Sequence, residues 1–256
     1  MTALEALKTY FHYEQFRPLQ EEIISSVLEG KDTLALMPTG GGKSLCFQIP
    51  TLVMAQDEAN RETGALCLVV TPLIALMKDQ VENLKKRGIQ AAAVYTGMSY
   101  DKQRVALDNC QFGPYRFLYV SPERLENEDF RKRLTQLPIR MIAVDEAHCI
   151  SQWGYDFRPS YLRIAEIRKY LHSTPSTLRP IPILALTATA TTDVVSDIQD
   201  KLGFREYHVK QQSFHRENLS YVVRYCGADG ERNKFEEIQH ILSRVKGSGI
   251  VYVRNR

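Results

Sequence analysis

A glycine-rich segment near the N-terminus has the residue types that bind phosphate. It follows an apolar stretch and precedes a helical pattern, and it consists of Thr39, Gly40, Gly41, Gly42, Lys43 and Ser44. Glycines let backbone N–H groups close around phosphate oxygens, and the N-terminus of the following helix adds the positive end of its dipole. In such a loop the Lys43 ammonium reaches the β- and γ-phosphates and the Ser44 hydroxyl binds Mg²⁺. The strict pattern has glycine where this chain has Met37.

A pair of acidic residues, Asp145 and Glu146, ends the apolar run 141–144. The end of a parallel strand lies at the crevice where doubly wound sheets bind ligands. Asp145 fits a carboxylate that holds Mg²⁺, directly or through water, and Glu146 fits the residue that orients or deprotonates an attacking water. An isolated acidic pair is more often a solvated turn, but the phosphate loop upstream favours catalysis. We therefore expect Lys43, Asp145 and Glu146 to be the catalytic residues.

The elements that must position these side chains alternate along the chain. Short, nearly continuous apolar runs predict buried strands at 32–37, 65–71, 91–95, 116–121, 140–145 and 182–187. Amphipathic stretches between them predict helices at 72–87, 99–110, 122–137, 159–171 and 191–202. This alternation predicts an α/β fold, a doubly wound and mainly parallel sheet with helices on both faces.

The pattern pauses near residues 203–210. A predicted strand at 219–224, a helix at 231–245 and a strand at 249–253 follow. Such a lone unit cannot close a hydrophobic core. We therefore expect residues 1–206 to form one domain and residues 207–256 to begin a second, incomplete one, with self-association as one way to cover its apolar surface.

The composition narrows the class of protein. Lys and Arg number 33 against 30 Asp and Glu, a net charge of +3, so any contact with nucleic acid must come from a local patch. There is neither an apolar run of about 18 residues that spans a bilayer nor a secretory signal, so we expect a cytoplasmic protein without a membrane partner. The cysteines are scattered and form no C-x-x-C pair, which argues against disulfides and zinc. They are Cys46, Cys67, Cys110, Cys149 and Cys226.

Two further segments make a family resemblance specific. The letters Asp-Glu-Ala-His at 145–148 and Leu-Thr-Ala-Thr-Ala-Thr at 186–191 resemble motifs II and III of superfamily 2 helicases. Residues 10–20 resemble the N-terminal motif 0 of the RecQ family of ATP-dependent DNA helicases, with His12 where the family has glycine. The resemblance implies that Tyr13 and Arg17 sandwich an adenine and that Gln20 hydrogen-bonds its edge. An aromatic face, a guanidinium plane and an amide suit that role.

Residues 151–159 resemble the aromatic-rich loop that couples single-stranded DNA binding to ATP hydrolysis in RecQ helicases. Trp153, Tyr155 and Phe157 suit base stacking, and Arg158 beside them suits a phosphate or cation–π contact. Core packing of the three aromatic side chains is the alternative, which the glycine and proline of the same loop disfavour.

Other segments match the family less specifically. Residues 71–76, 95–97 and 121–125 match its DNA-backbone motifs, each at the end of a predicted strand, where N–H groups at helix starts hold phosphates. Residues 214–219 and 249–253 resemble the start of a second RecA-like domain. On this resemblance, residues 1–206 are the first RecA-like, P-loop domain and residues 207–256 the start of the second.

The resemblance implies a 3′-to-5′ DNA helicase of DNA repair and recombination, which uses ATP and Mg²⁺ and binds single-stranded and partly duplex DNA. It implies a place at the bacterial nucleoid, or in the nucleus of a eukaryote. It also places arginines that hydrolysis requires in motifs after Arg256, so we expect residues 1–256 alone to bind Mg-ATP and DNA with almost no turnover. The alternatives are an RNA helicase of the same superfamily and a nucleotide-binding module without turnover.

Overall fold

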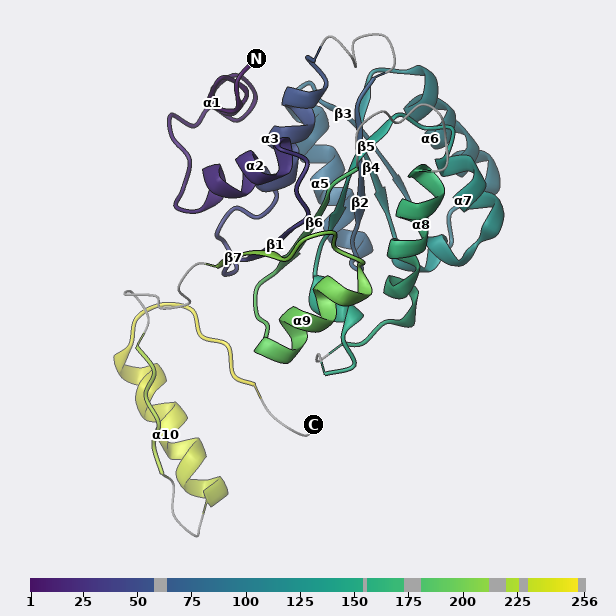
Figure 1. Cartoon of the computed structure of the whole chain (residues 1–256). Coiled ribbons are helices and arrows are strands. Elements are labelled where there is room, and N and C mark those ends of the chain that lie inside the picture. The colour runs from purple at the N-terminus through teal and green to yellow at the C-terminus, as the bar shows by residue number, and fades with distance from the viewer. Residues whose placement is uncertain (58–63, 154–155, 173–180, 212–219, 226–229, 253–256) are drawn as a thin grey trace. The chain divides into compact units, whose positions relative to one another are not determined.

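The computed structural model describes residues 1–57, 64–153, 156–172, 181–211, 220–225 and 230–252 (Figure 1). It divides the chain into two compact units, Met1–Phe214 and His215–Arg256. Among the described residues, no helix is long and apolar enough to cross a membrane.

The first unit, as far as it is described, is built on a seven-stranded sheet in the order β3-β4-β2-β5-β6-β1-β7. All the paired strands of this sheet are parallel in the described part of the unit, which confirms the predicted α/β fold. The central strands β1, β2 and β6 are buried along their whole length, as their continuous apolar sequences predict. The strands are β1 (Thr33–Leu36), β2 (Leu66–Val70), β3 (Gln90–Val94), β4 (Tyr115–Val120), β5 (Ile139–Val144), β6 (Ile183–Thr187) and β7 (His208–Gln211).

Helices cover both faces of this sheet (Figure 1). Successive residues of a strand point to opposite faces, and β2 accordingly sends Leu66, Leu68 and Val70 into one hydrophobic cluster and Cys67 and Val69 into the other. The second cluster lies under α1 (Ala3–Ala6), the π-helical turn η1 (Leu7–Phe11), α2 (Gln20–Leu28), α3 (Leu45–Met54) and α5 (Ile74–Lys86). The first lies under α6 (Tyr100–Phe112), α7 (Glu128–Leu134), α8 (Arg163–His172) and α9 (Thr192–Lys201).

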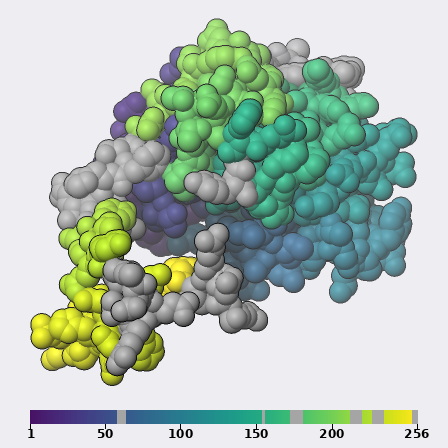
Figure 2. Space-filling model, turned by 90° about the horizontal axis from the view of Figure 1, so that it is seen from below, coloured from purple at the N-terminus to yellow at the C-terminus, as the bar shows by residue number. Residues whose placement is uncertain are grey.

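Short 3-10 turns lead into several of these helices or follow strands. They are η2 (Pro122–Glu126), η3 (Ala147–Ile150) and η4 (Pro159–Leu162). The helix predicted at 122–137 is therefore divided into η2 and α7, because the Asn127 side chain accepts a hydrogen bond from the Phe130 N–H and starts a new helix. Seen from below in Figure 2, the first unit presents surface from the start, the middle and the 190–205 region of the chain on one face.

Strand β7 extends the first unit beyond residue 206, where the sequence pattern ended it. It pairs with β1 in register from Thr33 with His208 to Leu36 with Gln211. Because β7 is an edge strand, its side chains are half-buried or exposed and its sequence, HVKQ, lacks the apolar run that marks the central strands. The contacts therefore place the end of the first unit at Phe214.

The second unit contains the predicted helix as α10 (Gly230–Arg244). The two strands predicted around it are wrong in their described parts, because residues 220–225 and 249–252 are not in strands. A strand needs a hydrogen-bonding neighbour, and no described residue of this unit provides one. Its apolar side chains are correspondingly exposed, and they include Tyr221, Val223, Phe235, Ile250 and Tyr252.

A buried carboxylate links four segments of the first unit. Asp32, which precedes β1, is fully buried and accepts hydrogen bonds from Arg168 Nη1 at 2.7 Å and Arg205 Nε at 3.1 Å. It also accepts from the backbone N–H groups of Ile183 and Arg205, each at 2.9 Å. This cluster ties β1 to α8, to β6 and to the segment before β7.

Candidate nucleotide and nucleic-acid site

The glycine-rich loop follows β1 and leads into α3, as its sequence predicts. Gly40 and Gly42 each have a φ of +81°, the left-handed region that glycine tolerates best. A Cβ on Gly42 would lie 2.4 Å from Gln20 Nε2, and one on Gly41 would lie 2.9 Å from the Pro38 carbonyl oxygen. The loop therefore needs its glycines both for its backbone conformation and for space.

Lys43 and Ser44 make their contacts at the end of this loop. Lys43 Nζ donates to the carbonyl oxygen of Met37 at 3.2 Å, so the ammonium is folded back over its own loop. Ser44 Oγ accepts a hydrogen bond from Gln80 Nε2 at 2.9 Å. Both side chains are half-buried.

Asp145 lies directly after β5, beside Thr71 at the end of β2. Its Oδ2 accepts from Thr71 Oγ1 at 3.3 Å, and its Oδ1 accepts from the Glu146 N–H at 3.0 Å. Burial raises the pKa of Asp145, and the charge of Glu146 raises it further, while the Lys43 ammonium and the two hydrogen bonds act in the opposite direction. Lys43 and Asp145 are 102 positions apart in the sequence. In the structure the charge of the Lys43 ammonium acts on the Asp145 carboxyl.

Glu146 belongs to a chain of polar groups that ends on β6. Its backbone is in the left-handed region, with a φ of 48°. His148 Nδ1 lies 3.4 Å from Glu146 Oε2 and 3.0 Å from Thr187 Oγ1, and Thr187 in turn donates to the Thr189 carbonyl. The acidic segment 145–148 and the threonine-rich segment 186–191 are therefore in direct contact.

The segment that resembles motif 0 is strained at two non-glycine positions. His12 has a φ of 59° and caps the π-helical turn, so it adopts the conformation that glycine takes more easily. Leu19 has a φ of 72° immediately before Gln20. The Gln20 amide is buried and used within the protein, because Oε1 accepts from the Arg17 N–H at 2.9 Å and Nε2 donates to the Gly42 carbonyl at 3.1 Å. The strained turn thus precedes Gln20, whose amide holds the phosphate loop.

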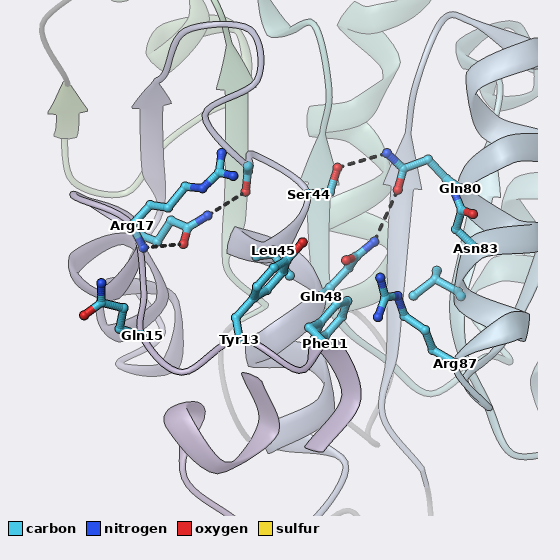
Figure 3. A pocket seen from close by; sticks show the side chains of 13 residues that line it. Phe11, Tyr13, Gln15, Arg17, Ser44, Leu45, Gln48, Gln80, Asn83 and Arg87 are labelled. Carbon is cyan, nitrogen blue, oxygen red and sulfur yellow. Dashed lines mark hydrogen bonds between the residues drawn. The ribbon is translucent and has the colours of Figure 1, made fainter. Parts of the chain in front are cut away.

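A pocket of about 420 Å³ lies between this segment, α3 and α5 (Figure 3). Tyr13, which is 49% exposed, and Arg17 both line it. Arg17 Nη1 donates to the Gly40 carbonyl at 2.5 Å, so its guanidinium lies against the phosphate loop. Phe11 and Arg87 line the opposite wall, with the guanidinium 5.2 Å from the ring centroid. The sequence does not indicate a site role for either residue, because an apolar Phe11 is typical of a core and Arg87 is typical of a solvated helix end.

Trp153 lies in the predicted aromatic loop and is 78% exposed. Its backbone N–H donates to Ser151 Oγ, which donates to Asp197 Oδ2 of α9 at 2.7 Å. Lys201 Nζ also binds Asp197, at 2.8 Å. An exposed indole on an anchored backbone is an available surface for base stacking. Tyr155 of the same loop lies outside the described residues.

Phe157 and Arg158 of the same loop are half-buried. Arg158 Nη2 donates to Asp156 Oδ2 at 2.9 Å, and its Nη1 lies 3.8 Å from Glu123 Oε1 of η2. The hydrogen bond to Asp156 raises the pKa of Arg158. Contact with a DNA phosphate would therefore require Arg158 to exchange its present carboxylate partners.

The site contains donors that suit Mg-ATP. Among the described residues, no group of three or more His, Cys, Asp and Glu side chains forms a metal site. Mg²⁺ is ordinarily held by one or two protein oxygens together with substrate phosphates, and Ser44 and the buried Asp145 carboxylate are such oxygens. The glycine loop, in which a Cβ would clash, and the Lys43 ammonium suit the phosphates.

Comparison with known proteins agrees with this chemistry. The family model described as DEAD/DEAH box helicase matches residues 17–198. The chain is 37% identical over 258 residues to the probable ATP-dependent DNA helicase RecS of Bacillus subtilis, a match that covers 100% of this chain and 48% of the relative. It is 39% identical over 255 residues to the ATP-dependent DNA helicase RecQ of the same organism, covering 99% and 40%. The chain thus spans about half of these relatives' length or less.

A solved structure shows the same fold at low sequence identity. The crystal structure of the DUF1998 helicase MrfA matches with a TM-score of 0.71 at 18% identity, over 99% of this chain and 38% of that chain. At this identity the match shows the fold alone.

Proposed function

Because the chain belongs to the DEAD/DEAH box helicase family, we propose that it is the ATP-binding part of a RecQ-like DNA helicase that moves along single-stranded DNA as it hydrolyses ATP. The observation that carries the proposal is that the Lys43 loop after β1 and Asp145 after β5 lie at the same carboxyl edge of the parallel sheet, where Thr71 donates to Asp145. Trp153, exposed on the loop that follows the acidic pair, is the proposed DNA contact.

The side chains have distinct roles in the proposed reaction. The phosphate loop and Lys43 bind the β- and γ-phosphates, and Tyr13 and Arg17 bind the adenine in the adjoining pocket. Ser44 and Asp145 hold Mg²⁺, which neutralises developing phosphate charge when bound. Glu146 orients the attacking water and accepts its proton, and His148 holds the Glu146 carboxylate on the side of Thr187.

Contact between the acidic segment and the aromatic loop supports coupling of DNA binding to hydrolysis. Tyr161 OH, in the turn after this loop, donates to the backbone carbonyl of Asp145 at 2.9 Å. The Arg158 N–H donates to the Cys149 carbonyl at 2.8 Å. A shift of the loop on DNA therefore has a hydrogen-bonded route to the backbone of Asp145, the residue whose carboxylate is the proposed Mg²⁺ ligand.

Further parts of the proposal rest on the resemblance to RecQ helicases. They are the 3′-to-5′ direction, a role in repair and recombination, action in the compartment that holds the DNA, and a second RecA-like domain of which residues 215–256 are the start. Self-association through the exposed apolar side chains of the second unit is a further part, supported by Tyr221, Phe235 and Tyr252.

We expect Lys43→Ala to weaken Mg-ATP binding at least about tenfold, because a charge-assisted phosphate contact is lost. Calorimetric titration of the 256-residue chain with Mg-ATP measures this. Lys132→Ala is the control, because Lys132 is an exposed lysine paired with Glu128 on α7. Unchanged affinity in Lys43→Ala would contradict the assignment of the phosphate loop.

We expect Trp153→Ala to weaken single-stranded DNA binding by about 1–3 kcal/mol, the usual contribution of one stacked base, with ATP affinity little changed. Fluorescence anisotropy with a labelled oligonucleotide measures the change. Phe112→Ala is a matched control, because Phe112 is 80% exposed at the end of α6 and lies outside the proposed site. Overlaying curves for Trp153→Ala and the parent would exclude the loop as a stacking platform, and tighter binding of RNA than DNA would favour an RNA helicase.

A further inference from the structure

Gln80 connects the middle of α5 to the phosphate loop. Its Nε2 donates to Ser44 Oγ at 2.9 Å (Figure 3). In the sequence it is a polar residue on a helical stripe otherwise formed by apolar residues such as Met77 and Leu84, both of which are buried. A half-buried side-chain amide needs hydrogen-bond partners, and the partners of Gln80 indicate its role.

The orientation of the Gln80 amide is set by two donors on its other side. Gln80 Oε1 accepts from Gln48 Nε2 at 3.2 Å and from Tyr119 OH at 3.3 Å. Both donors belong to buried residues, with Gln48 6% and Tyr119 1% exposed. An amide has one carbonyl oxygen and one NH₂ group. Because the oxygen is occupied by these two donors, the NH₂ group faces Ser44.

This contact restricts the Ser44 hydroxyl. A serine hydroxyl has one proton and two lone pairs, and it rotates freely when nothing holds it. The Gln80 NH₂ group occupies one lone pair, and its own hydrogens keep the Ser44 proton pointing elsewhere. One lone pair then remains for a cation, so the hydroxyl is oriented before metal binds.

The segment that carries Gln80 also contacts the second proposed Mg²⁺ ligand. Thr71, nine residues before Gln80 and directly after β2, donates to Asp145 Oδ2 at 3.3 Å. The stretch from 71 to 80 therefore contacts both Ser44 and Asp145. Its first residues are those predicted to hold the DNA backbone, and Leu73 and Leu76 at the start of α5 are exposed.

We propose that Gln80 is a positioning residue for Ser44, holding its hydroxyl ready for Mg²⁺ and tying the Mg-ATP site to α5. The proposal rests on the proposed function, because it requires Ser44 to be a Mg²⁺ ligand. Gln80 itself touches neither the nucleotide phosphates nor the metal in this assignment.

The test separates the magnesium-dependent part of nucleotide affinity from the rest. A fluorescent ATP analogue is titrated into the 256-residue chain in Mg²⁺ and again in EDTA. The dissociation constant in EDTA divided by that in Mg²⁺ is the ratio compared among variants, and it is large when Mg²⁺ strengthens binding. In Gln80→Leu we expect this ratio to fall about three- to tenfold, the range of one hydrogen bond. A merely structural role of Gln80 would change both affinities together and leave the ratio intact.

Control variants make the outcome specific. Tyr119→Phe removes one of the two hydrogen bonds that orient the Gln80 amide and leaves the one from Gln48, so it should lower the ratio less than Gln80→Leu does. Ser44→Ala should lower the ratio, and adding Gln80→Leu to it should cause no further loss. Gln80→Met keeps an unbranched side chain and replaces the leucine variant if that variant does not fold, as judged by thermal melting.

Two results distinguish this inference from the proposed function. If Ser44→Ala lowers the ratio and Gln80→Leu does not, the positioning role is overturned and the nucleotide site stands. If Ser44→Ala itself leaves the ratio unchanged, Ser44 is not a Mg²⁺ ligand, and both proposals about this residue are overturned.

Discussion

The 256-residue chain is expected to bind Mg-ATP and yet to release phosphate at well below about one turnover per second, with single-stranded DNA present. In related phosphoryl-transfer enzymes an arginine from a second element contributes about 10³–10⁵ in rate, which is about 4–7 kcal/mol of transition-state stabilisation. The resemblance to RecQ helicases implies that such arginines belong to a second RecA-like domain. The described residues of the second unit comprise helix α10 and its flanking segments, and apolar side chains among them, including Phe235 and Tyr252, are exposed rather than packed in a core.

A phosphate-release assay on the purified chain measures this turnover. Lys43→Ala supplies the background rate, because it removes the proposed phosphate contact. The assay is run at several protein concentrations, since a turnover number that rises with concentration would indicate an arginine supplied by a second copy. Turnover near one per second at every concentration would contradict the expectation.

Asp32→Ala is expected to lower the free energy of unfolding by about 3–5 kcal/mol, the cost of leaving buried charges without their partner. Asp32 is fully buried and binds both Arg168, which is 9% exposed at its side chain, and Arg205. It also receives the backbone N–H groups of Ile183 and Arg205. Removing the carboxylate therefore leaves a buried guanidinium and two N–H groups unsatisfied. Urea unfolding followed by circular dichroism measures the loss.

The pH dependence of stability provides a second measure of the Asp32 cluster. Burial by itself would raise the pKa of Asp32, but hydrogen bonds from Arg205, Ile183 and Arg168 outweigh it and lower the pKa. A carboxyl with a lowered folded-state pKa stabilises the protein above its unfolded pKa of about 3.9, and this stability is lost as the pH falls through the folded pKa. The gap in unfolding free energy between parent and Asp32→Ala should therefore narrow below about pH 4.

A surface pair gives the matched control for both measurements. Glu128 and Lys132 are 68% and 67% exposed at their side chains and form an i,i+4 pair on α7. Glu128→Gln should change the free energy of unfolding very little, because water screens exposed pairs. A loss as small as this in Asp32→Ala would show that the cluster does not stabilise the sheet.

The sequence by itself determined the elements whose signal is local. The six predicted strands and the helices between them are present, because a strand buried on both faces must be apolar throughout and a covering helix must be apolar on one stripe. The phosphate loop is likewise predictable from its letters, since Gly40 and Gly42 occupy a backbone conformation that other residues rarely adopt.

Only the tertiary structure decided the contacts between distant segments. Strand β7 has an unremarkable sequence and exists because the edge of β1 is free to pair with it, whereas the tail segments 220–225 and 249–252 have apolar sequences but no described neighbour to pair with. Two glutamine residues of the candidate site likewise make contacts that the sequence does not predict. Nothing in the local sequence indicates that Gln80 binds Ser44 or that the Gln20 amide holds Gly42, because a side-chain amide takes its role from whichever donors and acceptors the fold brings to it.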